Sequence, residues 1–261
     1  MHFATMIGIG LLVGLLIGLT GIGSGSLLTP LLILLGSMSP ATAVGTSISF
    51  SFLTKLYGSW KFYRRGLVNM EIVRDLSMGS LPGVLVGAFI IRYLNVRHPD
   101  VMNAFLRHSI GVALIVVAIM IAARMLPESK RPAVLDRPLL LSIALRRLFI
   151  IAVGFVVGVS MTVTSIGSGA ALIPAMILFY RLDSGSLVGT NLFIGTILAA
   201  TAGIPHLGFG HVDWRAVAGL VCGSIPALWV SSHVHGGLPH HVTDGIIAGG
   251  LMVMGVYIIA F

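Results

Sequence analysis

Two glycine- and serine-rich stretches interrupt long hydrophobic runs, and their residue types suit the binding of an anion. They read TGIGSGSLLTP from 20 to 30 and TSIGSGAALIP from 164 to 174. A helix that begins just after such a break has backbone N–H groups without intrahelical acceptors, and its dipole adds partial positive charge there. Serine hydroxyls beside these groups can cap the helix or donate to an anionic oxygen. The residues predicted to bind an anion at the two breaks are Gly23, Ser24, Gly25, Ser26, Gly167, Ser168 and Gly169.

The helix expected after each break opens with a further polar cluster, GTSISFSF from 45 and GTNLFIGT from 189. Thr46, Ser47, Thr190 and Asn191 therefore complete the predicted anion site. Short polar side chains of this kind also bond carbonyl groups of their own helix. The sequence leaves both roles open for these four residues.

Two ionisable residues lie near these clusters. Ser47, Ser51 and Lys55 follow one another at i, i+4 and i+8, so they share the face of a helix that leads toward a basic loop. We expect the Lys55 side chain to extend to the membrane interface. His206 follows Pro205 at the end of a predicted helix, and we expect it at the interface too, with a proton relay or a substrate contact as the alternative.

The two breaks belong to an internal duplication of the chain. Sliding the sequence against itself by 166 − 22 = 144 positions aligns IGSG at 22–25 with 166–169, without a gap. The same shift aligns VGT at 44–46 with 188–190, and GSLP at 79–82 with GSIP at 223–226. Matches at one fixed period over this length indicate two homologous halves rather than low complexity.

The composition places both halves in a lipid bilayer. The chain has 261 residues, of which 56% are hydrophobic and 9% charged, and its mean hydropathy is +1.03. These values are typical of an all-α polytopic membrane protein. We predict about 8 membrane segments, or up to 10 if short helices are counted separately. The predicted organisation is a first transmembrane repeat at 1–126, a polar linker at 127–144 and a second transmembrane repeat at 145–261.

The hydrophobic segment that opens each half is too long for one membrane crossing. Residues 5–36 and 148–180 contain no charged residue, and a straight helix over either would be about 48 Å long in a hydrocarbon core of about 30 Å. We therefore predict that each repeat opens with a broken or re-entrant pair of helices joined at the glycine-serine break. If this pair turns back, each half contains an odd number of membrane crossings or returns, and the second half is inverted relative to the first. We favour this inverted arrangement. One bent helix per segment would instead make them parallel.

The formal charge of +8 does not indicate binding to nucleic acid, because the basic residues lie between hydrophobic segments rather than in one patch. Most lysines and arginines fall on the side of the membrane that carries the linker. The positive-inside rule therefore predicts a cytoplasmic linker at 127–144. The same rule does not distinguish inverted from parallel repeats.

The sequence lacks the motifs of several other functional classes. We expect no enzyme, because the I-G-S-G stretches lack the glycine of a rhomboid-like G-x-S-G nucleophile and nucleotide-binding patterns are absent. The single cysteine, Cys222, excludes an intramolecular disulfide or a paired-cysteine redox site. We expect no cofactor and no metal, because surface loops commonly contain histidines such as His233, His235, His240 and His241.

The paired GIGSG and TSIGSG breaks, the VGT openings and the GS[LI]P helices together resemble the TauE/SafE family of sulfite exporters and related anion permeases. The resemblance covers nearly the whole chain. It implies a carrier in a bacterial or archaeal plasma membrane that moves small sulfur-containing or organic anions. The second half departs from the first, because Ser165 stands at the repeat position of Gly21 and Ala170 at that of Ser26. Equal roles for the two breaks therefore do not follow.

The predicted function is secondary transport of a small anion, most simply sulfite or an organosulfur anion, that binds near the midplane between the two breaks and moves by alternating access. The expected partners are this anion and the lipid bilayer, with a homodimer left open. A gated anion channel would use the same donors, and a noncatalytic membrane scaffold is the third alternative.

Overall fold

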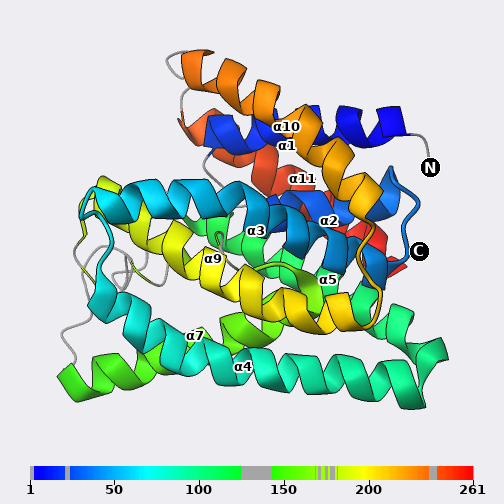
Figure 1. The fold of residues 1–261 in the computed structure, drawn as a ribbon, viewed down its shortest axis with the longest axis horizontal. Helices are drawn as coiled ribbons and strands as arrows, with labels where there is room; N and C mark the ends of the chain where they lie inside the picture. Colours follow the sequence, from blue (N-terminus) through cyan, green and yellow to red (C-terminus); the bar gives the residue numbers. More distant parts are fainter. Residues whose placement is uncertain are drawn as a thin grey trace.

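The structure is a computed structural model that describes residues 3–20, 24–124, 143–167, 169, 172–173, 176, 180, 182–234 and 240–260. This part of the chain is helical, with no strand (Figure 1), as the composition predicts. The linker predicted at 127–144 lies almost wholly outside the described residues. The helices are α1 Phe3–Thr20, α2 Ser24–Leu34, α3 Pro40–Arg64, α4 Met70–Arg97, α5 Pro99–Arg124, α7 Ile143–Thr164, α9 Ser184–Gly208, α10 Trp214–Val234 and α11 His240–Ala260.

The duplication seen in the sequence recurs in the helix boundaries. Helix α9 is α3 shifted by 184 − 40 = 144 residues at its start and by 208 − 64 = 144 at its end. The turn after each of these helices contains a glycine with positive φ, Gly66 at 70° and Gly210 at 71°, which is a conformation that favours glycine. A side-chain cap then begins the next helix in both halves. Asn69 Oδ1 accepts from the Ile72 amide at 3.2 Å, and Asp213 Oδ1 accepts from that of Ala216 at 3.0 Å.

Two tightly packed helix pairs each combine one helix from each half. Helix α1 packs along α10, and α4 packs along α7 (Figure 1). Within each pair the two helices run parallel to each other. A side chain on Gly10 would collide with the backbone of Leu220, and one on Gly154 with the backbone of Leu76. These contacts are repeat equivalents, because 154 − 10 and 220 − 76 both equal 144. Close approach of backbones at small residues is the usual way in which membrane helices associate.

Helices α3 and α9, which occupy equivalent positions in the two halves, pack against each other in opposite directions. A Cβ on Gly58 would lie 3.3 Å from Leu192, near the start of α9, whereas one on Gly203 would lie 3.5 Å from Ile48, near the start of α3. The rings of Tyr63 and Phe193 stack with their centroids 5.5 Å apart. Residue numbers therefore rise along one helix as they fall along the other.

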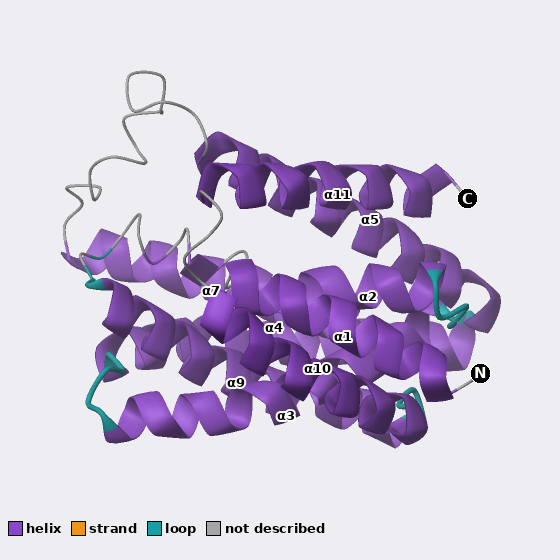
Figure 2. Cartoon of the chain, turned by 90° about the horizontal axis from the view of Figure 1, so that it is seen from above, coloured by secondary structure: helices purple, strands orange, loops and turns teal. Residues whose placement is uncertain are grey.

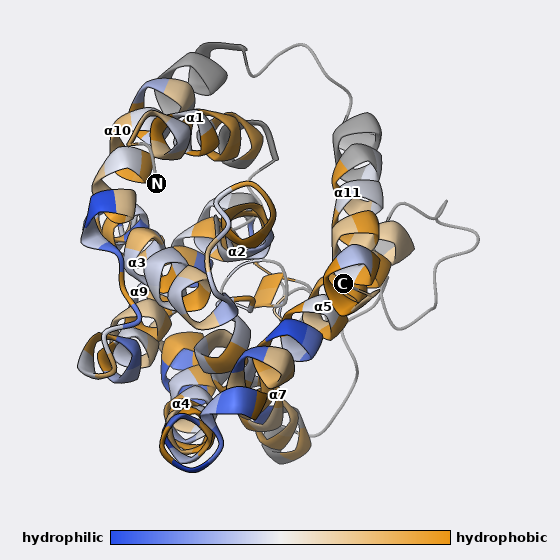
Figure 3. Cartoon of the chain, turned by 90° about the vertical axis from the view of Figure 1, so that its right-hand side faces the viewer, coloured by the Kyte–Doolittle hydropathy of each residue, from blue (hydrophilic) through white to orange (hydrophobic). Residues whose placement is uncertain are grey.

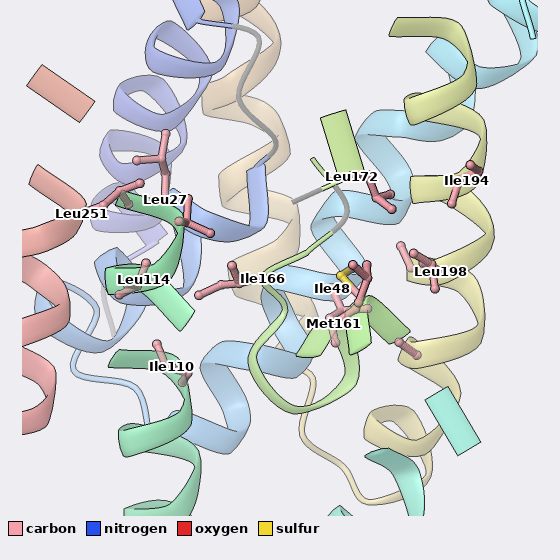
Figure 4. Packing of buried hydrophobic residues seen from close by; sticks show 14 of the residues in the cluster. Leu27, Ile48, Ile110, Leu114, Met161, Ile166, Leu172, Ile194, Leu198 and Leu251 are labelled. Atoms are coloured by element: carbon pink, nitrogen blue, oxygen red, sulfur yellow. The ribbon is translucent and has the colours of Figure 1, made fainter. Parts of the chain in front are cut away.

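The remaining pair, α5 and α11, lies together at one side of the molecule (Figures 2 and 3). Gly111 and Gly255 are repeat equivalents, and a Cβ on Gly255 would lie 3.0 Å from the carbonyl oxygen of Gly111. The main apolar core connects this pair to the rest of the fold. It brings Leu114, Leu27, Ile166 and Ile48 into one cluster (Figure 4).

An ion pair makes the two tight helix pairs unequal. Asp75 of α4 is 2% exposed and accepts a hydrogen bond from Arg147 Nε of α7 at 3.0 Å. The repeat positions of these residues, in the α1–α10 pair, hold Gly219 and Phe3. A Cβ on Gly219 would lie 3.3 Å from the Phe3 ring. The fold thus uses a polar contact at one place and an apolar contact at its equivalent.

The outer surface is suited to lipid. Large apolar side chains such as Leu85 (71%) and Val253 (69%) are exposed, which soluble monomers avoid over extended areas. Four of the described segments have the length and hydropathy of a membrane span: Met70–Arg97, Pro99–Ala123, Arg147–Thr164 and Gly185–Gly208. Shorter apolar helices are Phe3–Leu16, Gly25–Leu34 and Ile247–Ala260. The helical fold of a membrane protein is therefore confirmed.

Candidate anion site

The first break separates α1, which ends at Thr20, from α2, which begins at Ser24. Gly25 and Ser26 lie in the first turn of α2 and are buried. The N–H groups at this position have no intrahelical acceptor. Pro30, inside the same short helix, has no N–H to donate to the carbonyl of Ser26 one turn earlier. The buried first turn of α2 therefore offers several backbone groups that the helix itself does not bond.

The second break follows α7, which ends at Thr164. Ser165 has φ of 63° and Gly167 has φ of 151°, so the chain leaves the helix through a conformation that is uncommon for a serine. Hydroxyl groups bond the peptide groups that the break sets free. Thr164 Oγ1 accepts from the Ile166 amide at 3.1 Å, and Ser160 Oγ donates to the Ile166 carbonyl at 2.8 Å. Such pairing is what permits non-helical backbone within a membrane protein.

The two breaks meet in the interior. Gly25 lies so close to Ser165 that a Cβ would collide with its carbonyl oxygen and come within 3.2 Å of its Oγ. Ser165 Oγ donates to Ser47 Oγ at 3.1 Å, and both serines are fully buried. The start of α2, the second turn of α3 and the end of α7 therefore converge at one point. The convergence gathers hydroxyl and amide groups of both halves.

The predicted residues Thr46 and Thr190 join the two halves symmetrically. Thr46 Oγ1 accepts from the Asp213 amide at 3.1 Å, and Thr190 Oγ1 accepts from the Asn69 amide at 3.0 Å. These bonds are repeat equivalents, since 190 − 46 and 213 − 69 both equal 144. Because the two hydroxyl groups act as acceptors in these bonds, each still has a hydrogen that it can donate. The threonines therefore have a structural task that the sequence did not indicate.

Replacing Thr46 or Thr190 with valine is expected to lower stability by about 1 kcal/mol each, because a partly buried amide loses its acceptor while the side-chain shape is kept. Thr201→Val is the matched control. Its Oγ1 donates to the Ile197 carbonyl of its own helix at 2.9 Å, and that carbonyl also accepts the helix bond. Thermal unfolding of purified protein in detergent measures the three variants. An equal loss in Thr201→Val would contradict the special role of the bonds between halves.

Asn191 occupies the repeat position of Ser47 and is 6% exposed. Its Oδ1 is buried and has no hydrogen-bond partner. Burying a polar atom without a partner is costly, so such atoms are rare in folded proteins and call for an explanation. Because Oδ1 only accepts, the group of Asn191 that could bind an anion is its amide NH2, one residue after Thr190 at the opening of α9.

Two sequence expectations are wrong. Lys55 was expected to extend to the interface, but it is 6% exposed, and Ser47 and Ser51 on the same face of α3 are fully buried. His206 was expected at the interface as well, but it has no exposed surface. Both side chains face the interior because their helices pack against other helices on that side. Hydropathy alone does not reveal such packing.

The other predicted residues are less fully described. Gly23 and Ser168 lie outside the described residues, as does the side chain of Ser24, whose backbone begins α2. Gly167 and Gly169 are buried after α7, and the Gly169 amide donates to the Gly167 carbonyl at 2.8 Å. The structure thus brings Gly25 and Ser47 together at Ser165. Thr46 instead bonds the Asp213 amide, and Thr190 bonds the Asn69 amide.

Three residues of this region were missed as contributors: Ser165, Asn69 and Asp213. Ser165 stands at the repeat position of Gly21, and a position that holds glycine in one copy signals unusual backbone geometry in both. Asn69 and Asp213 are equivalent polar residues just before predicted helices, which is the usual place of an N-cap. Both signals were present in the sequence.

Comparison with known proteins gives a consistent result. The family model described as Sulfite exporter TauE/SafE matches residues 6–258. The chain is 35% identical over 251 residues to the probable membrane transporter protein YjnA of Bacillus subtilis (strain 168), which covers 96% of this chain and 97% of YjnA. It is 26% identical over 238 residues to the probable membrane transporter protein YunE of the same organism, with 86% and 85% covered. No solved structure matches the chain.

Proposed function

Since the chain belongs to the TauE/SafE family of sulfite exporters and is a multi-pass membrane transporter, we propose that it carries a small anion between the two helix breaks. The substrate in this proposal is sulfite or an organosulfur anion. The anion binds near the midplane to amide and hydroxyl donors of both halves. It crosses the membrane by alternating access.

The observation that carries the proposal is the contact between the two breaks. Gly25 lies against the Ser165 backbone, and Ser47 accepts from the Ser165 hydroxyl at 3.1 Å. Backbone N–H groups at the start of a helix and nearby hydroxyls suit an anionic oxygen, because they add donors and partial positive charge without a fixed ion pair. Donors of this kind permit binding that is weak enough for release.

The predicted binding residues fit this proposal to different degrees. Gly25 and Ser26 lie in the buried first turn of α2, and Ser47 and Asn191 supply buried polar side chains. Thr46 and Thr190 hold the halves together and have one hydroxyl hydrogen each to donate. Gly23, Ser24, Gly167, Ser168 and Gly169 belong to the same set through their places at the two breaks.

Alternating access is supported by the arrangement of the halves. Helices α3 and α9 are repeat equivalents and run in opposite directions, so the operation that exchanges the halves reverses helix direction. If both helices cross the membrane, the repeats have inverted topology. Two inverted halves that rock about a shared central site are the usual basis of alternating access.

The orientation in this proposal places the linker 127–144 in the cytoplasm of a bacterium, because most basic residues lie on that side. The turn after α3 follows Lys61, Arg64 and Arg65 and shares this side. The equivalent turn after α9, which includes His211 and Asp213, then faces outward.

A flux assay tests the proposal. Purified protein in liposomes is loaded with unlabelled sulfite, thiosulfate, sulfate or sulfoacetate, and entry of the labelled anion is followed. We expect saturable counterflow for at least one sulfur oxyanion. Flux equal to that of empty liposomes would contradict transport, and single-channel currents across a planar bilayer would favour a gated channel.

A further inference from the structure

We propose that His206, which is fully buried, and the half-buried His211 beside it form a proton-binding site through which anion transport is coupled to protons. The inference rests on the proposed anion transport and names its coupling ion. The pair lies where α9 ends and the chain turns into α10. If the proton and the anion are bound inside the transporter at the same time, one conformational change carries both in the same direction. The coupling is therefore proton–anion symport.

His206 has one ring nitrogen in a hydrogen bond and one without a partner. Its Nε2 lies 2.9 Å from the carbonyl oxygen of Thr162. Since a carbonyl only accepts, Nε2 carries the hydrogen, and Nδ1 of the neutral ring is an open acceptor. Nδ1 is buried and has no hydrogen-bond partner. A proton taken up at this ring therefore binds at Nδ1.

His211 lies beside His206. The two rings are 5.6 Å apart between centroids and inclined by 57°, and His211 Nδ1 is also buried without a partner. The residue lies in the connection between α9 and α10, where burial lowers the pKa of its imidazole below the ordinary value. The two rings together hold one proton at a time, because a charge on one ring opposes a charge on the other.

The groups around the pair do not neutralise such a proton. Helix α3 presents Gly45, α7 presents Thr162, and the connection adds Phe209, whose ring is 5.7 Å from that of His211. The titratable residues nearest along the chain are Asp213, whose carboxylate caps α10 through Ala216 at 3.0 Å, and the exposed Arg215. In the described part of the chain, neither ring has an acidic side chain within ion-pair distance. A bound proton thus favours the arrival of an anion.

The pair lies next to the proposed anion site. A Cβ on Gly45 would lie 3.2 Å from His206 Cβ, and Gly45 precedes Ser47 by two residues. Thr162, which accepts the His206 bond, precedes Ser165 by three residues, or about 4.5 Å along a helix. His206 therefore bridges the same two segments as the contact between Ser47 and Ser165. Opposite charges at this separation within a membrane protein attract strongly, and each makes binding of the other tighter.

The equivalent place in the first half has the same backbone packing but no titratable side chains. The repeat positions of His206 and His211 are Phe62 and Leu67, since 206 − 62 and 211 − 67 both equal 144. Gly189 lies against the Leu67 carbonyl and the Phe62 ring as Gly45 lies against the His211 carbonyl and His206. The fold is therefore built at this place without a titratable side chain. The imidazoles add a function that the packing does not require.

The test uses protein in liposomes with the voltage clamped by potassium and valinomycin. An inward gradient of one pH unit drives labelled thiosulfate or sulfoacetate, whichever shows counterflow, because sulfite itself exchanges protons near neutral pH. With the voltage clamped at zero, one-to-one symport predicts about tenfold accumulation per pH unit, whatever the charge of the anion. His206→Phe, which installs the residue of the first half, is expected to abolish accumulation. His108→Phe, at an exposed histidine of α5, should accumulate the anion like the wild type.

Three results would overturn the inference: no response of the wild type to the gradient, unchanged accumulation in His206→Phe, or equal loss in His108→Phe. Absence of counterflow in the wild type would overturn the proposed function itself, so the two failures are distinguishable. His211→Leu, in a connection rather than a helix, is the second variant and should also lose accumulation. Size-exclusion and thermal unfolding profiles establish that both variants fold.

Discussion

Valine at position 25 is expected to reduce anion counterflow to the level of empty liposomes. Any side chain at Gly25 would collide with the carbonyl oxygen of Ser165, so the two breaks would have to move apart. The start of α2 would then lie farther from the end of α7. Positioned binding groups lose most of their effect when they shift by about 1 Å, and the expected loss is therefore complete.

Gly8→Val is the matched control for this substitution. Gly8 lies in α1, and a Cβ there would have no neighbouring atom within 4 Å. Both variants place the same β-branched residue in a helix, so they share its intrinsic cost, but only Gly25→Val disturbs the contact between the breaks. Wild-type counterflow in Gly25→Val, or equal loss in Gly8→Val, would contradict our account of the site.

Asn191→Leu is expected to lower counterflow about tenfold or more while the protein becomes no less stable. Asn191 Oδ1 is buried without a partner, which costs about 1–3 kcal/mol, and a bound anion does not remove this cost because Oδ1 only accepts. Leucine has nearly the same size and removes that cost. The amide NH2 of Asn191 is the donor that leucine also removes. A hydrogen bond from this group to a charged anion contributes about 1.5–3 kcal/mol, and its loss would weaken anion binding about tenfold or more.

The combination of results distinguishes a ligand group from a packing residue. Thermal unfolding and counterflow are measured on the same preparation of Asn191→Leu. Asn191→Ser, which supplies the residue of the first half at Ser47, serves as the comparison and should retain more flux than leucine. A fall in stability with unchanged flux would mean that Asn191 acts in packing alone.

Much of the fold was predictable because its signals are local. The shift of 144 residues predicted that equivalent segments form equivalent helices, and α3 and α9 confirm this to the residue. The IGSG stretches predicted interruptions, and α1 and α7 end beside them, because glycine and short hydroxyl residues permit the chain to leave a helix. The helical membrane class followed from the composition alone.

The neighbours of the predicted residues were not predictable, because they depend on how distant segments pack. Nothing in the sequence near Thr46 indicates that its hydroxyl binds the Asp213 amide of the other half. The burial of Lys55 and His206 likewise results from packing of α3 and α9. The contact of Ser47 with Ser165 joins residues 165 − 47 = 118 positions apart, which no pattern within one helix reveals.

The most direct test of the central claim, that the second break meets the opening of α3 at the transport site, is a disulfide between Ser47→Cys and Ser165→Cys in a Cys222→Ser background. The hydroxyl oxygens are 3.1 Å apart. Ser49→Cys with Ser165→Cys is the control, because Ser49 bonds the Gly45 carbonyl of its own helix instead. Mild oxidation should cross-link the first pair alone and stop counterflow, and reduction should restore it. Cross-linking of the control but not of the first pair, or full transport by the cross-linked protein, would contradict the account.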